Sequence, residues 1–244
     1  MNNALYVGLS RQETLQRALE IAANNIANAD TAGFKLESLL VQTEPGSAPS
    51  TPDARPVAYV LDHGVTRDFT QGAMEGTGNP YDLSVEGLGF FQIQTANGMR
   101  YTRDGRFTVD NKNQLVTKAG DPVMDAGGRP IVLDPTKPEP AIAQDGTISQ
   151  GGTPGAKLGV YRFPDLAQLQ KVGGNLFEAP AAMTPTVAAD GVVRQGTVEK
   201  SNVQPVLEIT NLIEISRAYE RVAQMMSQQN DLSSQAISRL GKAA

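Results

Sequence analysis

The distribution of glycine and proline is the strongest constraint on how this chain can fold. All 15 Pro lie between Pro45 and Pro205, and all but three of the 24 Gly lie between residues 34 and 205. Because these residues interrupt regular helices more strongly than any others, long helices are confined to the two ends. The chain therefore has three parts: two ends that favour helices and a centre that favours turns.

Both ends predict long amphipathic helices. The first is expected from about Ala4 to Ala29, with apolar residues at heptad spacing and Gly33 as its stop. The second is expected after Pro205, which suits a first helical turn. Each helix has one narrow apolar seam, so two arrangements stay open. The helices close an ordinary domain, or they form a coiled coil that other copies complete.

The centre predicts many short antiparallel strands. It contains four dipeptides that are typical of hairpin turns, namely Asn97-Gly98, Asp104-Gly105, Asp145-Gly146 and Asp190-Gly191. The expected fold class is mixed α and β, with N- and C-terminal helices that form a coiled coil and a central all-β antiparallel domain. The expected domains are a helical terminal assembly domain (1–33 and 206–244), an extended or β connector (34–78 and 180–205) and the central β domain (79–179).

Composition excludes most chemistry. The chain has no Cys and a single His, so it cannot build a disulfide, a thiolate nucleophile or a site of paired His ligands. We expect His63 at the surface, in a turn between strands. A net charge of −5 does not favour nucleic-acid binding. We expect no catalytic residue, no metal and no cofactor, and no direct membrane insertion or cleaved signal peptide, because no suitable apolar run is present.

The end of the first expected helix is unusual for a helix. Asn24, Asn25 and Asn28 alternate with small residues and are followed by Thr31-Ala32-Gly33-Phe34-Lys35. Asn disfavours helix interiors, so the cluster suggests amide contacts across a close interface. This segment resembles the N-terminal signature of the bacterial flagellar axial proteins, the rod and hook family. Further matching motifs follow in order, including residues 71–72, 77–80, 82–83, 87–91, 101–107, 115–117, 201–203 and 217–220.

Within that family, three segments are most similar to proximal-rod members: residues 4–12, 29–31 and 171–177. A distal-rod member or another axial paralogue is the alternative. Gln204 departs from the family pattern, in which Asn is usual at this position. Remote alternatives are a wall-cleaving enzyme, with a carboxylate pair such as Asp82 and Glu86, and a soluble adaptor for rod assembly.

The resemblance implies a structural subunit of the basal-body rod that crosses the periplasm, polymerises helically through its terminal helices and transmits torque. Its partners would be copies of itself, neighbouring proximal-rod proteins and the distal rod protein, with the flagellar type III export apparatus in transit. Export through that apparatus would need no cleaved signal peptide. Residues 1–33 and 206–244 are expected to be largely disordered in the free monomer, because two narrow seams do not offset the entropy of ordering them.

The expected assembly interface combines the apolar seams with the Asn cluster. On the first helix it contains Leu5, Leu15, Leu19, Asn24, Asn25, Ile26 and Asn28. On the second helix it contains Leu212, Ile215, Tyr219, Val222 and Met226. Some of these residues could instead pack only within one subunit.

Overall fold

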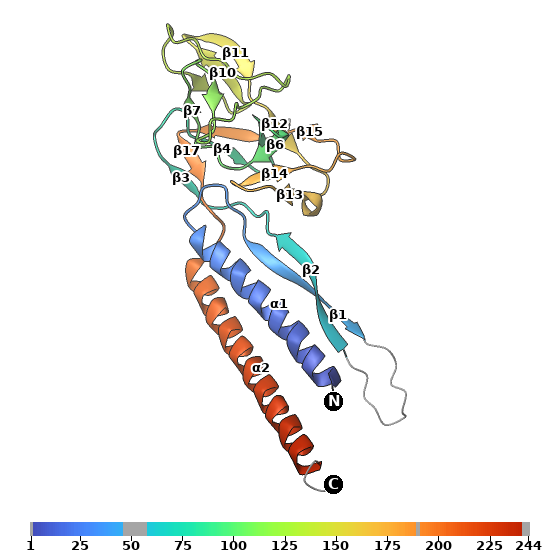
Figure 1. Cartoon of the computed structure of the whole chain (residues 1–244). Coiled ribbons are helices and arrows are strands. Elements are labelled where there is room, and N and C mark those ends of the chain that lie inside the picture. Colours follow the sequence, from blue (N-terminus) through green and yellow to red (C-terminus); the bar gives the residue numbers. More distant parts are fainter. Residues whose placement is uncertain (1, 46–57, 189–190, 241–244) are drawn as a thin grey trace. The chain divides into compact units, whose positions relative to one another are not determined.

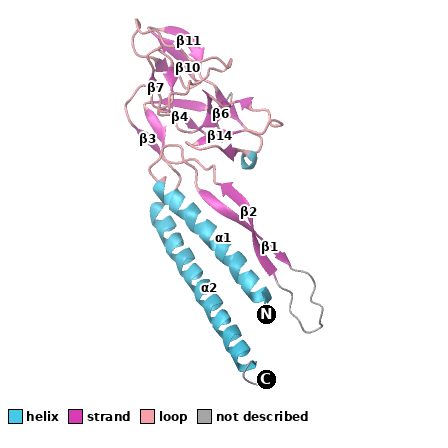
Figure 2. Cartoon of the chain, in the orientation of Figure 1, coloured by secondary structure: helices cyan, strands magenta, loops and turns pink. Residues whose placement is uncertain are grey.

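The computed structural model describes residues 2–45, 58–188 and 191–240. It shows one helix near each end of the chain and antiparallel strands between them (Figures 1 and 2). This confirms the expected mixed class with terminal helices and a central antiparallel β region. The chain divides into two compact units. Unit 1 combines Met1–Ala27, Glu37–Asp68 and Gln204–Ala244, and unit 2 combines Asn28–Leu36 and Phe69–Val203.

Unit 1 consists of two helices and one hairpin. Its elements are α1 (Asn2–Ala27), β1 (Glu37–Pro45), β2 (Ala58–Arg67) and α2 (Pro205–Leu240). Helix α1 contacts α2, which runs in the opposite direction, and it also contacts both strands of the hairpin (Figure 1). Pro205 begins α2, as expected, because its fixed φ fits a first helical turn. Part of the expected connector 34–78, residues 46–57, lies outside the described residues, and Pro45 ends β1.

The two helices approach each other closely along one face of each. Gly8 lies opposite Met226, and a Cβ at Gly8 would be 2.9 Å from Met226 Cγ. One turn further along α1, Gln12 Nε2 donates a hydrogen bond of 2.8 Å to Tyr219 Oη. At the other end of α1, Asn25 Nδ2 donates to Glu208 Oε2 at 3.1 Å. The small residue at position 8 therefore leaves room for the Met226 side chain between the two helices.

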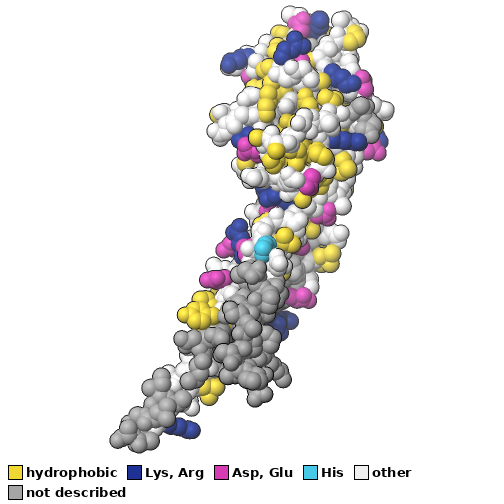
Figure 3. Space-filling model, turned by 90° about the vertical axis from the view of Figure 1, so that its right-hand side faces the viewer, with side chains coloured by type: hydrophobic (Ala, Val, Ile, Leu, Met, Phe, Trp, Pro, Cys, Tyr) yellow, Lys and Arg dark blue, Asp and Glu magenta, His cyan; other side chains and the backbone are white. Residues whose placement is uncertain are grey.

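The hairpin of β1 and β2 contains a bulge. Leu39 pairs with Val65 and Val41 pairs with Asp62, so one residue of β1 lies opposite two residues of β2. His63 is one of those two residues and lies exposed at the surface (Figure 3). The expected surface position is confirmed, but His63 lies within a strand and not in a turn between strands.

Unit 2 is built from short strands around a six-stranded antiparallel sheet, in the order β13-β14-β6-β5-β12-β15. The remaining strands form a three-stranded sheet and pairs, of which β4–β16 and β3–β17 join segments far apart in the sequence. The elements are β3 (Met74–Gly76), β4 (Leu83–Glu86), β5 (Phe90–Thr95), β6 (Gly98–Thr102), β7 (Thr108–Val109), β8 (Leu115–Val116), β9 (Ala141–Ile142), β10 (Thr147–Gln150), β11 (Thr153–Lys157), β12 (Val160–Arg162), η1 (Leu166–Gln168), β13 (Gln170–Lys171), β14 (Leu176–Glu178), β15 (Thr186–Val187), β16 (Val192–Gln195) and β17 (Thr197–Glu199).

Two apolar clusters form the core of unit 2. Successive side chains of a strand point to opposite faces, and the pair Phe90 and Phe91 on β5 shows this directly. Phe91 belongs to the larger cluster, with Leu83, Ile93 and others, whereas Phe90 belongs to a smaller aromatic cluster. Phe90 packs edge to face on Phe163 and Phe177 there. The two residues therefore connect both clusters through one strand.

The structure differs from the expected turns and boundaries at several points. Asp104-Gly105 is not a hairpin turn: a Cβ at Gly105 would be 1.6 Å from Leu83 O, so glycine is needed there for a close backbone approach.

The expected connector segments, 34–78 and 180–205, are divided between the units. Residues 37–68 join the helices in unit 1, while 69–78 and 180–203 belong to unit 2 because β3 and β4 pair with β17 and β16.

Candidate functional site

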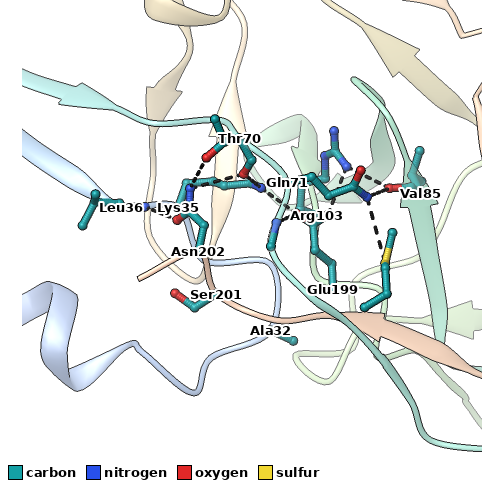
Figure 4. A network of polar contacts seen from close by, with 12 residues as sticks. Ala32, Lys35, Leu36, Thr70, Gln71, Val85, Arg103, Glu199, Ser201 and Asn202 are labelled. Atoms are coloured by element: carbon teal, nitrogen blue, oxygen red, sulfur yellow. Dashed lines mark hydrogen bonds and ion pairs between the residues drawn. The ribbon is translucent and has the colours of Figure 1, made fainter. Parts of the chain in front are cut away.

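A buried cluster of charged side chains lies within unit 2 (Figure 4). Glu199 Oε1 accepts from Lys35 Nζ at 2.6 Å and from the Gly72 backbone N–H at 3.0 Å. Glu199 Oε2 accepts from Arg103 Nη1 at 3.0 Å. The three charged side chains are at most 2% exposed. One carboxylate therefore bridges two cations that come from distant parts of the sequence.

Arg103 is held by further acceptors. Its Nη1 also donates to Val85 O at 3.0 Å, its Nη2 donates to Gly87 O, and its Cζ lies 5.0 Å from the centroid of the Phe90 ring. Burial lowers the pKa of Arg103 from its ordinary value, and the charge of Glu199 opposes that change. The guanidinium fork thus joins Glu199 to the loop between β4 and β5.

Asn202 forms a second centre of hydrogen bonds in the same region. Its Oδ1 accepts from the Leu36 backbone N–H at 2.8 Å, and its Nδ2 donates to Thr70 O at 3.2 Å and Thr70 Oγ1 at 3.1 Å. Thr70 O also accepts from Lys35 Nζ at 2.7 Å. We name the set Lys35, Thr70, Arg103, Glu199 and Asn202 the polar junction.

The polar junction brings together motifs that are far apart in the sequence. Lys35, Arg103 and Asn202 belong to the motifs at residues 31–35, 101–107 and 201–203. Gly33, with φ of +69°, donates its N–H to Glu199 O at 2.8 Å, and a Cβ at Gly33 would be 2.4 Å from Asp104 N. Glycine is therefore required at position 33 for two reasons: the backbone conformation is left-handed, and no space is left for a side chain.

Glu199 could not be identified from the sequence. It is one of 26 acidic residues, and no local pattern distinguishes it from those at the surface. The motif residues were identifiable, but their convergence depends on the pairing of β17 with β3, which joins positions more than a hundred residues apart.

The described residues show no arrangement suited to catalysis or metal binding. The charged groups of the polar junction are buried and paired with one another, and no group of three or more metal-ligating side chains occurs in the described part of the chain. Among the described helices, none is long and apolar enough to span a bilayer.

Of the expected interface residues on α1, two are buried within unit 1. Leu15 is 5% exposed and Asn25 is 1% exposed. Asn25 binds the backbone of Glu37 through both its amide atoms, at 2.8 and 3.0 Å. Leu5, Leu19 and Ile26 are half-buried, and Asn24 is exposed. Asn28 belongs to unit 2, where its Oδ1 accepts from Thr31 Oγ1 at 3.2 Å.

The expected interface residues of α2 form one face, and that face is turned towards α1. Tyr219 and Met226 make the contacts with Gln12 and Gly8, and all five residues are half-buried. Their contact with a neighbouring subunit stays a prediction. The exposed large apolar residues lie on other faces of α2. They are Val206, Leu207, Ile209, Ile213, Met225 and Leu232, with exposures between 44% and 76%.

Comparisons with known proteins cover the regions that supply the polar junction and both helices. Residues 5–35 match the family model of the flagella basal body rod protein. Residues 84–150 match that of the flagellar hook protein FlgE/F/G D1 domain, and residues 194–239 match that of the flagellar basal body rod FlgEFG protein C-terminal region.

Full-length relatives agree with these matches. The chain is 51% identical to the flagellar basal-body rod protein FlgF of Caulobacter vibrioides and 36% identical to FlgF of Mesorhizobium japonicum, with 99% of each chain covered. It is 35% identical to FlgG of Buchnera aphidicola, over 89% of this chain and 92% of that relative. The family is one of structural rod proteins and not of enzymes. The expected resemblance is confirmed: the chain belongs to the FlgF family of flagellar basal-body rod proteins.

Proposed function

We propose that this chain is a structural subunit of the proximal rod, which polymerises helically through α1 and α2 and transmits torque. The observation that carries the proposal is the pattern of exposed apolar residues on α2. The seam of α2 that faces α1 is already used inside the subunit, yet large apolar side chains remain exposed elsewhere on the helix. Contiguous exposed apolar surface is typical of a protein interaction site.

Three of these residues define one face. Val206, Ile209 and Ile213 are spaced by three and four residues, so they lie on the same side of the helix. They are 76%, 47% and 44% exposed. We name them the outer stripe. At roughly 25 cal/mol per Å² of apolar surface, covering such side chains with a neighbouring subunit contributes favourably to assembly.

The outer stripe explains how a coiled coil would arise. Within one subunit, α1 and α2 form an antiparallel pair. A helix from a neighbouring subunit that packs on the outer stripe would extend this pair into a larger helical bundle. Contacts that join two different surfaces and do not close into a ring generate a helical filament.

Partners and location follow from this function. The partners are other copies of this chain, neighbouring proximal-rod proteins and the distal rod protein, with the flagellar type III export apparatus in transit. The location is the basal-body rod across the periplasm. Support comes from family membership and from the two helices. A soluble assembly adaptor, the other candidate, would be absent from purified basal bodies.

The test compares two substitutions on α2 that add the same charge. Ile213→Lys places a charge in the outer stripe, whereas Asn211→Lys places one at an exposed position on another face of the helix. We expect Ile213→Lys to reduce the amount of the protein in purified basal bodies at least about tenfold, the effect of roughly 1.4 kcal/mol. Asn211→Lys should be incorporated normally. Equal incorporation of both variants would contradict the proposed interface.

A further inference from the structure

The chain passes between the two units four times. The crossings follow Ala27, Leu36, Asp68 and Val203. These four covalent connections carry force from unit 1 to unit 2. The segments of unit 2 next to the crossings therefore bear that force first.

These segments are all held by the polar junction or by bonds beside it. Leu36 lies at one crossing, and its N–H is bound by Asn202, which itself lies near the last crossing. Thr70, just after the third crossing, accepts from both Asn202 and Lys35. The segment that follows the first crossing is held by the bond from Gly33 to Glu199 O.

A second set of contacts fastens the same segment. Asn175 Nδ2 donates to Ala32 O at 3.1 Å, and Lys171 Nζ lies 4.4 Å from the centroid of the Phe34 ring. Glu199 then connects the whole arrangement to the β core, because Arg103 lies against Phe90 and binds two backbone carbonyls before β5.

We propose that Asn202 and Glu199 form a mechanical anchor, which ties the crossing segments to one another and to the β core of unit 2. This proposal rests on the proposed function, since a torque-transmitting subunit must resist forces that pull these segments apart. Asn202 is a positioning residue in this scheme, because it joins the Leu36 segment to the Thr70 segment.

The chemistry of the anchor favours a positional role over a purely stabilising one. A buried ion cluster is on average no more stabilising than well-packed apolar residues, but its geometry is directional. Asn202 is only half-buried, so its amide contributes little apolar packing to the core. Its three hydrogen bonds nevertheless hold the Leu36 segment and the Thr70 segment at a fixed distance from the segment that contains Asn202.

The test is to pull on the full-length chain with an optical trap. The native sequence has no Cys, so Asp30→Cys and Gln204→Cys provide two unique attachment points. A force between them is carried across the bonds of Gly33, Lys35 and Leu36 to residues 199–202, in parallel with the contact between α1 and α2, which all the variants share. We compare this parent with Asn202→Ala and with Asn97→Ala, which alters an exposed turn residue of the same type.

We expect the first opening event to be about tenfold faster at zero force in Asn202→Ala, and unchanged in Asn97→Ala. The thermal midpoint of the β core should be nearly the same in all three proteins. Asn202→Asp keeps the acceptor for Leu36 N–H and should restore part of the resistance. The proposal is overturned if Asn202→Ala opens at the parent rate, or if faster opening is accompanied by an equal loss of global stability.

This result is independent of rod incorporation, because it is measured on the monomer. A protein that shows the anchor but is absent from basal bodies would contradict the proposed function and leave the anchor intact. If the protein is incorporated into basal bodies but Asn202→Ala opens at the parent rate, the result would contradict the anchor and leave the proposed function intact.

Discussion

At the scale of single residues, Glu199 joins the two cations of the polar junction. It is the one acidic side chain in the polar junction, and both of its oxygens are bound. Glu199→Gln would remove the buried carboxylate that pairs with both Lys35 and Arg103. We expect a loss of about 3–5 kcal/mol in the free energy of unfolding, measured by urea denaturation.

The matched control is a pair at the surface. Glu75 lies 3.1 Å from Lys200, and both side chains are about half exposed. Glu75→Gln should cost less than about 1 kcal/mol, because water screens the pair. Equal losses in unfolding free energy for Glu75→Gln and Glu199→Gln would show that the buried cluster contributes no more to stability than a surface ion pair.

Two tyrosines of unit 2, the buried Tyr101 and the half-buried Tyr161, contribute to its stability at high pH. Burial raises the pKa of Tyr101, and burial also raises the pKa of Tyr161. A phenol with a raised pKa stabilises the fold below its unfolded-state pKa of about 10, and this contribution is lost as the pH rises through the folded value. Replacing both by Phe should flatten the fall in unfolding free energy above pH ~10. An unchanged slope in that variant would exclude these phenols as the cause.

At the scale of elements, the periodicity of the sequence located both helices and the seam of α2. It could not say what the seam faces, because a neighbouring subunit and the same subunit offer equally apolar partners. The structure turns Tyr219 and Met226 towards α1, so the outer stripe is left for other contacts. The outer stripe was not predicted, because its residues lie at the start of α2, on a different face from the longer regular seam.

Gly8 tests how closely the two helices must pack. Helix propensity alone would favour a larger residue over glycine by up to about 1 kcal/mol. A Cβ at this position would lie 2.9 Å from Met226 Cγ, at the flexible part of that side chain. Gly8→Ala should therefore be tolerated, while Gly8→Leu should overpack the contact at a cost of about 1–3 kcal/mol.

Amide hydrogen exchange distinguishes a gain in helix propensity from overpacking of the contact between the helices. The amides of α1 should exchange faster in Gly8→Leu than in Gly8→Ala, and those of the β core should not change. Slower exchange throughout α1 in Gly8→Leu would mean that propensity dominates and that the helices are not closely packed at this point.

At the scale of the whole molecule, the distribution of glycine and proline predicted the order of its parts. Two helices enclose an antiparallel β region in the sequence, because breakers are nearly absent from the ends. The sequence could not predict how the middle is divided. The pairing of β3 with β17 and of β4 with β16 depends on contacts across more than a hundred residues, which no local pattern encodes.

In the rod, we expect neighbouring subunits to cover the outer stripe. Because the native chain has no Cys, Ile213→Cys introduces a single thiol, whose reaction with a maleimide can be measured in the free monomer and in purified basal bodies. We predict rapid labelling of the monomer, at least tenfold slower labelling in intact basal bodies, and rapid labelling again after the rods are dissociated. Equal labelling of monomer and basal bodies would show that the outer stripe stays exposed after assembly, and would contradict this account.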